Sequence, residues 1–139
     1  MEIKRAQDKI KEFDEARGWQ DNWNFKDLLL NITEETGEAW NLVKWVDEEK
    51  QKKIVSEKKR EVSDYVGDTM FLLLKIANQS KVDVEQALQN TLDEYEKRMP
   101  PEVMKKLKHA NKLAGGWDNK DNGDKDEKSN ISSQMGRKS

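Results

Sequence analysis

Residues 70–77 read MFLLLKIA, and this stretch decides the fold of the chain. Its apolar side chains would cover nearly every side of a helix, a pattern typical of the buried centre of a helical bundle. The run is too short to span a bilayer and contains a lysine, so we expect no membrane-spanning segment. The sequence therefore predicts a helix from about Ile54 to Asn78, with its C-terminal half at the centre of an all-α fold.

Amphipathic helices are predicted before this segment. Ile3, Ala6, Ile10 and Phe13 recur at spacings of three and four residues, which indicates a first helix that ends near Gly18. A tryptophan-rich connection leads into a second helix over about residues 25–46, and the charged residues 47–61 connect it to the apolar helix. The first half of the chain is thus predicted to form helices joined by polar connections.

Two signals organise the rest of the chain. Asp83, with Gln86 three residues later, resembles a capping box, so a helix is predicted from there to Met99, where a Pro-Pro pair ends it. The prolines can open a short fifth helix over residues 101–114. Residues 115–139 are mostly small or polar and offer little to bury. We therefore expect one all-α domain over residues 1–114 and a disordered polar tail over residues 115–139.

Composition excludes several classes of protein. The chain of 139 residues has a formal net charge of −2, which gives no electrostatic argument for a nucleic-acid or membrane partner. It contains no cysteine, so neither a disulfide nor a thiolate metal site is possible. The first 13 residues lack the apolar core of a signal peptide, so we expect a cytoplasmic protein. A hydrophobic content of 34% gives a thin core, which favours a homo-oligomer, either a dimer or a tetramer.

Three glutamates interrupt the second predicted helix. At about 100° per residue, Glu35 falls within the apolar stripe that includes Leu28 and Leu42. Glu38 falls on the border of this stripe, and Glu34 turns toward solvent. Because a buried carboxylate is costly unless it is paired or bound to a metal, Glu35 is a candidate for a functional residue.

The apolar helix carries a second group of acids. Glu61, Asp64 and Asp68 are three and four residues apart, so all three share one stripe of the helix, and Lys75 lies further along it. Taken alone, either group is explained by chance spacing or by surface salt bridges with lysines. Two acid groups on separate helices, each beside an apolar face, instead favour a shared site.

The chemistry of these acids points to a hard metal ion. All-oxygen ligation is what Mg²⁺ or Mn²⁺ prefers, and such metals commonly serve phosphate chemistry. A di-iron centre would need two E-x-x-H motifs, and the single histidine, His109, lies outside both acid groups. The sequence therefore predicts a site for a hard metal ion, Mg²⁺ or Mn²⁺.

Together these motifs resemble the MazG-type all-α nucleoside triphosphate pyrophosphohydrolases. The similarity spans about residues 13–100 and includes ARGW (16–19), EETGEAWNLVKW (34–45), DTMFLLLKIANQSKVDVEQAL (68–88) and KRMP (97–100). The resemblance implies an oligomeric bundle of four to five helices. It also implies Mg²⁺-dependent hydrolysis of nucleoside or deoxynucleoside triphosphates between the α and β phosphates, giving a monophosphate and pyrophosphate. A role in nucleotide-pool cleanup and an active site near a subunit contact are implied in the same way.

The resemblance assigns roles to individual acids. Glu35, Glu38 and Asp68 match catalytic metal ligands of the family, and Glu34 matches a leading glutamate that is less uniformly a ligand. Tyr65 departs from the pattern, since relatives usually have a glutamate three residues before the aspartate.

Two other acids, Asp64 and Glu61, lie on the same stripe of this helix as Asp68 and could take the place of a glutamate at position 65. Asp64 is preferred as the fourth ligand, because an i, i+4 pair with Asp68 places two carboxylates about one turn apart. Glu61 remains possible, at about 10 Å from Asp68 along the helix axis. The tyrosine at position 65 also favours an alternative, a non-catalytic helical regulatory or adaptor protein that kept the fold.

Four further residues are candidates for substrate contacts. Lys75 and Arg98 could bind phosphates, the latter by its match to a basic residue of the family, although ordinary surface charge explains both equally well. Trp45 follows Glu38 by two turns and Trp19 lies in the tryptophan-rich connection, and aromatic faces are what a nucleobase stacks on. For each tryptophan the alternative is a side chain that only fills the core.

Overall fold

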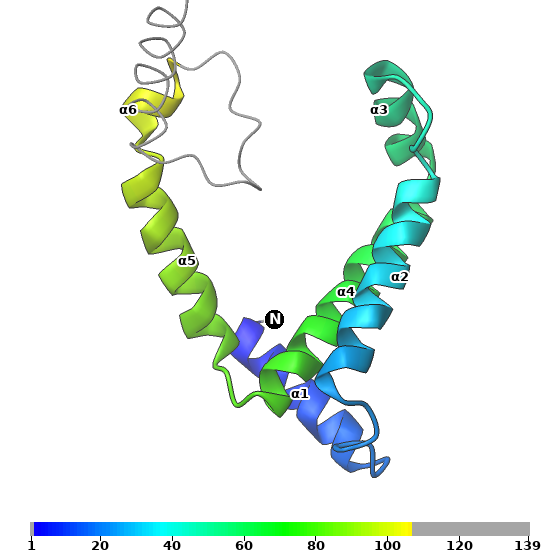
Figure 1. Ribbon diagram of the computed structural model, residues 1–139, viewed down its shortest axis with the longest axis vertical. Coiled ribbons are helices and arrows are strands. Elements are labelled where there is room, and N and C mark those ends of the chain that lie inside the picture. The colour runs from blue at the N-terminus through cyan, green and yellow to red at the C-terminus, as the bar shows by residue number, and fades with distance from the viewer. Residues whose placement is uncertain (1, 107–139) are drawn as a thin grey trace, which may run out of the picture. The chain divides into compact units, whose positions relative to one another are not determined.

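The computed structural model describes residues 2–106, and every element in this range is a helix (Figure 1). The elements are α1 (Ile3–Glu15), α2 (Phe25–Asn41), α3 (Glu48–Glu57), α4 (Lys59–Gln79), α5 (Val84–Arg98) and α6 (Pro101–Met104). The all-α prediction is confirmed. The predicted polar tail, the domain boundary at residue 114, most of the fifth predicted helix and His109 lie outside the described residues.

Contacts within the chain form two compact units, one over residues 1–87 and the other from residue 88. In the first unit α4 contacts α1, α2 and α3, so it is the central helix, as its apolar sequence predicts. The core of this unit contains Leu28 of α2 together with Leu72, Leu74 and Ala77 of α4. Within residues 2–106, no helix is both long and apolar enough to cross a membrane.

One expected connection is a helix instead. The charged residues 47–61 were expected to join two helices, but α3 forms over Glu48–Glu57. The Asp47 carboxylate accepts a hydrogen bond from the Lys50 backbone N–H at 2.9 Å and caps its first turn. Glu48 and Glu49 follow in that turn, where negative charge is favoured by the helix dipole. The described residues thus hold six helices where four or five were expected.

Two predicted helix boundaries are corrected by the structure. α2 ends at Asn41 and not at residue 46, because a turn follows in which the Val43 N–H bonds to the Trp40 carbonyl at 3.0 Å. The predicted helix from Ile54 is divided at Lys58, whose φ of −98° and ψ of 37° leave the helical region. The acids that sequence analysis placed on two helices still belong to two helices, α2 and α4.

Side-chain caps begin α2 and α5. Asn24 and Asp27 form a reciprocal capping box at the start of α2, with bonds of 2.9 and 3.3 Å between each side chain and the other's backbone N–H. At the start of α5 the Asp83 carboxylate accepts a bond from the Gln86 N–H at 3.0 Å, which is the Asp83 half of the predicted capping box.

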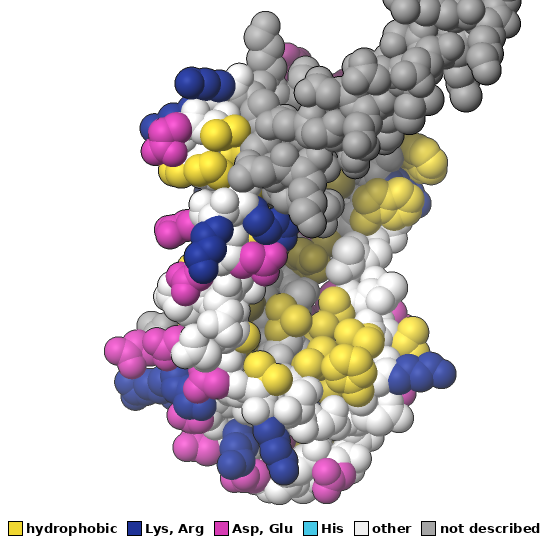
Figure 2. All heavy atoms as spheres, turned by 60° about the vertical axis from the view of Figure 1, so that its left-hand side comes forward, with side chains coloured by type: hydrophobic (Ala, Val, Ile, Leu, Met, Phe, Trp, Pro, Cys, Tyr) yellow, Lys and Arg dark blue, Asp and Glu magenta, His cyan; other side chains and the backbone are white. Residues whose placement is uncertain are grey.

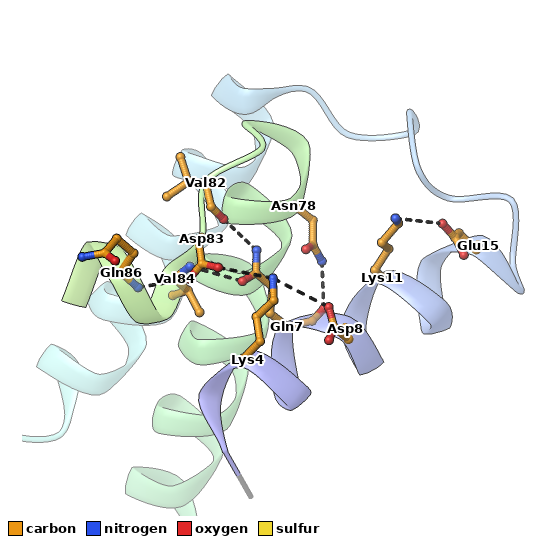
Figure 3. Close-up of polar contacts among 10 residues, drawn as sticks. All are labelled: Lys4, Gln7, Asp8, Lys11, Glu15, Asn78, Val82, Asp83, Val84 and Gln86. Carbon is orange, nitrogen blue, oxygen red and sulfur yellow. Dashed lines mark hydrogen bonds and ion pairs between the residues drawn. The ribbon is translucent and has the colours of Figure 1, made fainter. Parts of the chain in front are cut away.

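The turn between α4 and α5 is held by α1 (Figure 3). The buried Gln7 side chain donates to the Val82 carbonyl at 2.7 Å and accepts from the Val84 N–H at 3.2 Å. Asn78 donates to the Gln7 carbonyl at 3.1 Å, and Lys4 lies 3.6 Å from the Asp83 carboxylate. One amide side chain therefore satisfies a backbone acceptor and a backbone donor in a turn that would otherwise leave both unpaired.

A buried ion pair joins α1 to α4. The Lys75 Nζ lies 2.9 Å from the Asp14 Oδ1, and both residues are buried. The same ammonium lies 4.2 Å from the centre of the Trp23 ring and 5.4 Å from that of Phe71, close enough for cation–π attraction. Lysine is rarely buried without such partners, and here it has a carboxylate and aromatic faces.

The second unit contains most of α5 and α6. α6 begins with Pro101 in its first turn after Pro100, where a missing N–H costs no helical hydrogen bond. The prediction that the prolines end one helix and open another is therefore confirmed.

The ion pair predicts a pattern of stability changes. Lys75→Met or Asp14→Asn alone is expected to lower the free energy of unfolding by about 3–5 kcal/mol, because each leaves a buried partner unpaired. The double variant Asp14→Asn/Lys75→Met is expected to lose less than the sum of the two single losses. Urea denaturation followed by circular dichroism measures all four proteins. Additive losses would show that the two groups do not act as a pair.

Candidate functional site

Acids from α2 and α4 line one cavity. The two helices lie side by side (Figure 1), and between them is a cavity of about 420 Å³, within the size range of small-molecule sites. Five carboxylates, one phenol and two aliphatic side chains line it: Glu35, Glu38, Glu61, Asp64, Asp68, Tyr65, Ala39 and Leu42. The coincidence of two acid groups in the sequence favours a shared site, and the structure places all five acids in the lining of one cavity.

On α2 the acids differ in their surroundings. Glu35 is half-buried, whereas Glu38 and Glu34 are exposed, as their positions relative to the apolar stripe predict. Glu34 does not belong to the cavity lining. Partial burial raises the pKa of Glu35 above its usual value, and the charges of Asp68, Glu38 and Glu34 raise it further. The ionised form of Glu35 therefore lowers the stability of the fold.

On α4 the acids also differ. Glu61, Asp64 and Asp68 are all exposed and all line the cavity. The pKa of Glu61 is lowered, first by a hydrogen bond from its own backbone N–H and then by Lys58, whose Nζ lies 3.3 Å away. Glu61 already has a cation beside it, so Asp64 is the better placed of the two to offer its charge to a ligand.

Tyr65 is a cavity residue that sequence analysis treated only as a departure from the family. It lies on the same face of α4 as Asp68, and its hydroxyl is 3.4 Å from the Thr36 hydroxyl of α2. The spacing of positions 61, 65 and 68 is the signal that could have placed it in the site. The Tyr65 and Thr36 hydroxyls thus meet between the two helices at the acidic cavity.

Lys75 and Trp19 do not line the acidic cavity. Lys75 is buried against Asp14 and lines a different cavity of about 220 Å³. Trp19 packs edge-on against Phe13 and Trp23, with ring centres 5.9 and 5.2 Å apart. For both residues the structure supports a role in packing α1 on α4. Asp14 was missed as the partner of Lys75 because no local pattern links positions 61 residues apart.

Trp45 and Arg98 are also outside the cavity lining. Trp45 is 84% exposed, and its ring centre lies 6.3 Å from that of Trp40 in a tilted arrangement. Arg98 belongs to the second unit, where its guanidinium lies 2.7 Å from the Glu94 carboxylate. Their roles as base and phosphate contacts stay predictions.

The cavity offers the chemistry of a hard-metal site. Its donors are carboxylate oxygens, which suit Mg²⁺ or Mn²⁺. Within residues 2–106, however, no three acidic or histidine side chains are close enough together to hold a metal ion. Glu38, Asp64 and Asp68 are exposed and can change rotamer, so the donor set fits a cation once these side chains turn toward a common point.

Comparisons with known proteins agree with this geometry. Residues 24–104, more than half of the chain, match the model of the MazG nucleotide pyrophosphohydrolase domain. The fold is similar to that of a pyrophosphatase from Archaeoglobus fulgidus, with a TM-score of 0.62 and 22% sequence identity over 69% of this chain and 90% of that chain. No curated protein matches the sequence.

The chain belongs to the MazG nucleotide pyrophosphohydrolase family. It is a hydrolase that acts on the phosphoanhydride bonds of nucleotides. The matched residues include both helices of the acidic cavity, so the cavity is the candidate active site.

The electrostatics of the cavity predict that one substitution stabilises the metal-free protein. Glu35→Gln is expected to raise the melting temperature in EDTA at neutral pH, because it removes a charge that burial and three neighbouring acids disfavour. After allowance for solvent screening, the rise should be about 2–5 °C. Glu12→Gln, at an exposed position of α1, is the matched control and should change little. A lower melting temperature for Glu35→Gln would show that the charge is not under strain.

Proposed function

We propose that the acidic cavity between α2 and α4 hydrolyses nucleoside or deoxynucleoside triphosphates between the α and β phosphates. The products are a nucleoside monophosphate and pyrophosphate. The observation that carries this proposal is that five carboxylates from two helices line one cavity of about 420 Å³ in a chain of this family. Cleanup of the cytoplasmic nucleotide pool is the biological role that fits this reaction.

Glu35, Glu38, Asp64 and Asp68 are the proposed Mg²⁺ ligands, with Mn²⁺ as a substitute. Two of these residues belong to α2 and two to α4, so an ion bound between the helices would have ligands from both. When bound, the metal would offset the negative charge on phosphate oxygens that a cavity of carboxylates otherwise repels. Glu61, already beside Lys58, is left as a secondary ligand, and Glu34 lies outside the lining.

Besides binding metal, a carboxylate of the cavity is proposed to act as the general base in the reaction. Water attacks the α phosphorus, the bond to the bridging oxygen breaks, and pyrophosphate leaves with the bonding electron pair. A cavity carboxylate that is not bound to metal orients this water and takes its proton, which then passes to solvent. Four of the five acids are the proposed ligands, so Glu61 is the candidate for this spare group whenever it is not itself a ligand.

The base and the phosphate tail need contacts beyond the acids. Trp45 is proposed to stack on the base, because its ring is 84% exposed and lies in the same unit as the cavity. Arg98 is proposed to contact the phosphates.

Pyrophosphate release from a mixture of nucleoside and deoxynucleoside triphosphates with Mg²⁺ tests the reaction. Wild type is expected to release pyrophosphate. Glu35→Gln, Glu38→Gln and Asp68→Asn are expected to lower kcat/KM by at least about a hundredfold, since each removes a proposed ligand. Asp64→Asn should lower it more than Glu61→Gln.

Glu12→Gln is again the matched control and should keep full activity. If wild type releases inorganic phosphate instead of pyrophosphate, or if the Glu35 and Glu38 variants keep normal turnover, the proposal is wrong.

A homo-oligomer, either a dimer or a tetramer, is proposed as the active form. Hydrophobic side chains lie at the surface of the described residues (Figure 2), and Val66, Met70 and Leu73 form one stripe of α4 with 39–53% of each residue exposed. Val55 of α3 and Val66 line a shallow groove beside it. A stripe at spacings of four and three is what a partner helix would cover.

Light scattering tests this assembly. Wild type at micromolar concentration is expected to have the mass of a dimer or a tetramer, and Met70→Glu is expected to shift it toward the monomer, because the substitution buries a charge at the contact. Leu88→Glu, at an exposed apolar position of α5 that is not part of the stripe, is the comparison variant. A clean monomer mass for wild type would contradict the proposal.

A further inference from the structure

The wall of the acidic cavity is nearly without hydrogen-bond donors. Of the side chains that line it, five are carboxylates and two are aliphatic, and an ionised carboxylate only accepts hydrogen bonds. The Tyr65 hydroxyl is the one side-chain donor among these lining residues. An oxyanion that enters the cavity can therefore receive a side-chain hydrogen bond from the wall only at this position.

A neutral donor has an advantage over a charged one in this place. A lysine or arginine among these acids would form ion pairs with them, as Lys58 does with Glu61 at 3.3 Å, and would compete with a metal for the carboxylates. The phenol of Tyr65 adds a donor and leaves the charges of Glu35 and Asp68 available.

Thr36 is placed to orient this donor. Two other hydroxyls bond back to carbonyls of the preceding helical turn: Thr33 donates to the Leu29 carbonyl at 2.9 Å and Ser80 to that of Ile76 at 2.7 Å. The Thr36 hydroxyl instead lies 3.4 Å from the Tyr65 hydroxyl on the other helix. When Thr36 donates to the phenol oxygen, the phenol proton is free to point into the cavity. The contact is long, so it positions the phenol without locking it.

We propose that Tyr65 is a substrate-contacting residue, whose hydroxyl donates a hydrogen bond to a non-bridging phosphate oxygen, and that Thr36 is its positioning residue. This inference rests on the proposed function of the same cavity. The tyrosine at position 65, which departs from the family's usual glutamate, thus replaces a possible metal ligand with a phosphate donor.

The direct test compares wild type with Tyr65→Phe, which removes the hydroxyl and keeps the ring. Pyrophosphate release gives kcat/KM. Calorimetric binding of inorganic tripolyphosphate with Mg²⁺ gives a second measurement that needs neither turnover nor a particular base. Tyr65→Phe is expected to lower kcat/KM by roughly 10- to 100-fold, the usual effect of one hydrogen bond to a charged group. It should weaken tripolyphosphate binding and leave Mn²⁺ affinity and the melting temperature unchanged.

The role of Thr36 is tested by a double-mutant cycle. Thr36→Val, which replaces the hydroxyl with a methyl group, is expected to lower kcat/KM by roughly 3- to 10-fold, and Thr36→Ser should restore it. Because Thr36 acts through Tyr65, the Tyr65→Phe/Thr36→Val protein should be no less active than Tyr65→Phe alone. Additive losses would remove the positioning role.

The outcomes separate this inference from the proposed function. If wild type releases pyrophosphate and Tyr65→Phe matches it in turnover and in tripolyphosphate binding, the inference is overturned and the function stands. If wild type releases none but binds tripolyphosphate more tightly than Tyr65→Phe does, the function fails and the phosphate contact stands. If wild type neither releases pyrophosphate nor binds tripolyphosphate, both are overturned.

Discussion

The acidic cavity depends on how α4 is held along its length. Five carboxylates that face one another repel, so something other than the cavity must keep α2 and α4 together. The C-terminal half of α4 does this: Leu72, Leu74 and Ala77 are buried there, and the Lys75–Asp14 pair joins the helix to α1. The N-terminal half of α4 can therefore present acids toward α2. Packing in the C-terminal half of α4 therefore offsets the repulsion between carboxylates in its N-terminal half.

This division links stability to function. Partial burial and neighbouring charge raise the pKa of Glu35, so in the absence of a cation the fold holds that charge at a cost. A cation that binds only the folded chain would relieve the repulsion and stabilise the protein by mass action.

Sequence analysis recovered the features that depend on local periodicity. A repeat of 3.6 residues per turn was enough to predict an all-α chain and to place acids on one face of each of two helices. The coincidence of the two groups then favoured the shared cavity that Glu35, Glu38 and Asp68 line. It did not find contacts between distant parts of the chain. The Lys75–Asp14 pair joins positions 61 residues apart, and no local pattern links them. α3 was missed because a highly charged segment has no apolar stripe, although Asp47 followed by two glutamates is a helix-start signal.

The central claim is that the acids of α2 and α4 form one metal site, and Mn²⁺ binding measured by electron paramagnetic resonance tests it most directly. The account predicts that wild type binds Mn²⁺ and that Glu38→Gln of α2 and Asp68→Asn of α4 each weaken binding by at least about tenfold. Glu12→Gln should bind as wild type does. Mn²⁺ binding that is unchanged in both site variants, or lost in the variant of only one helix, would contradict a site shared between the two helices.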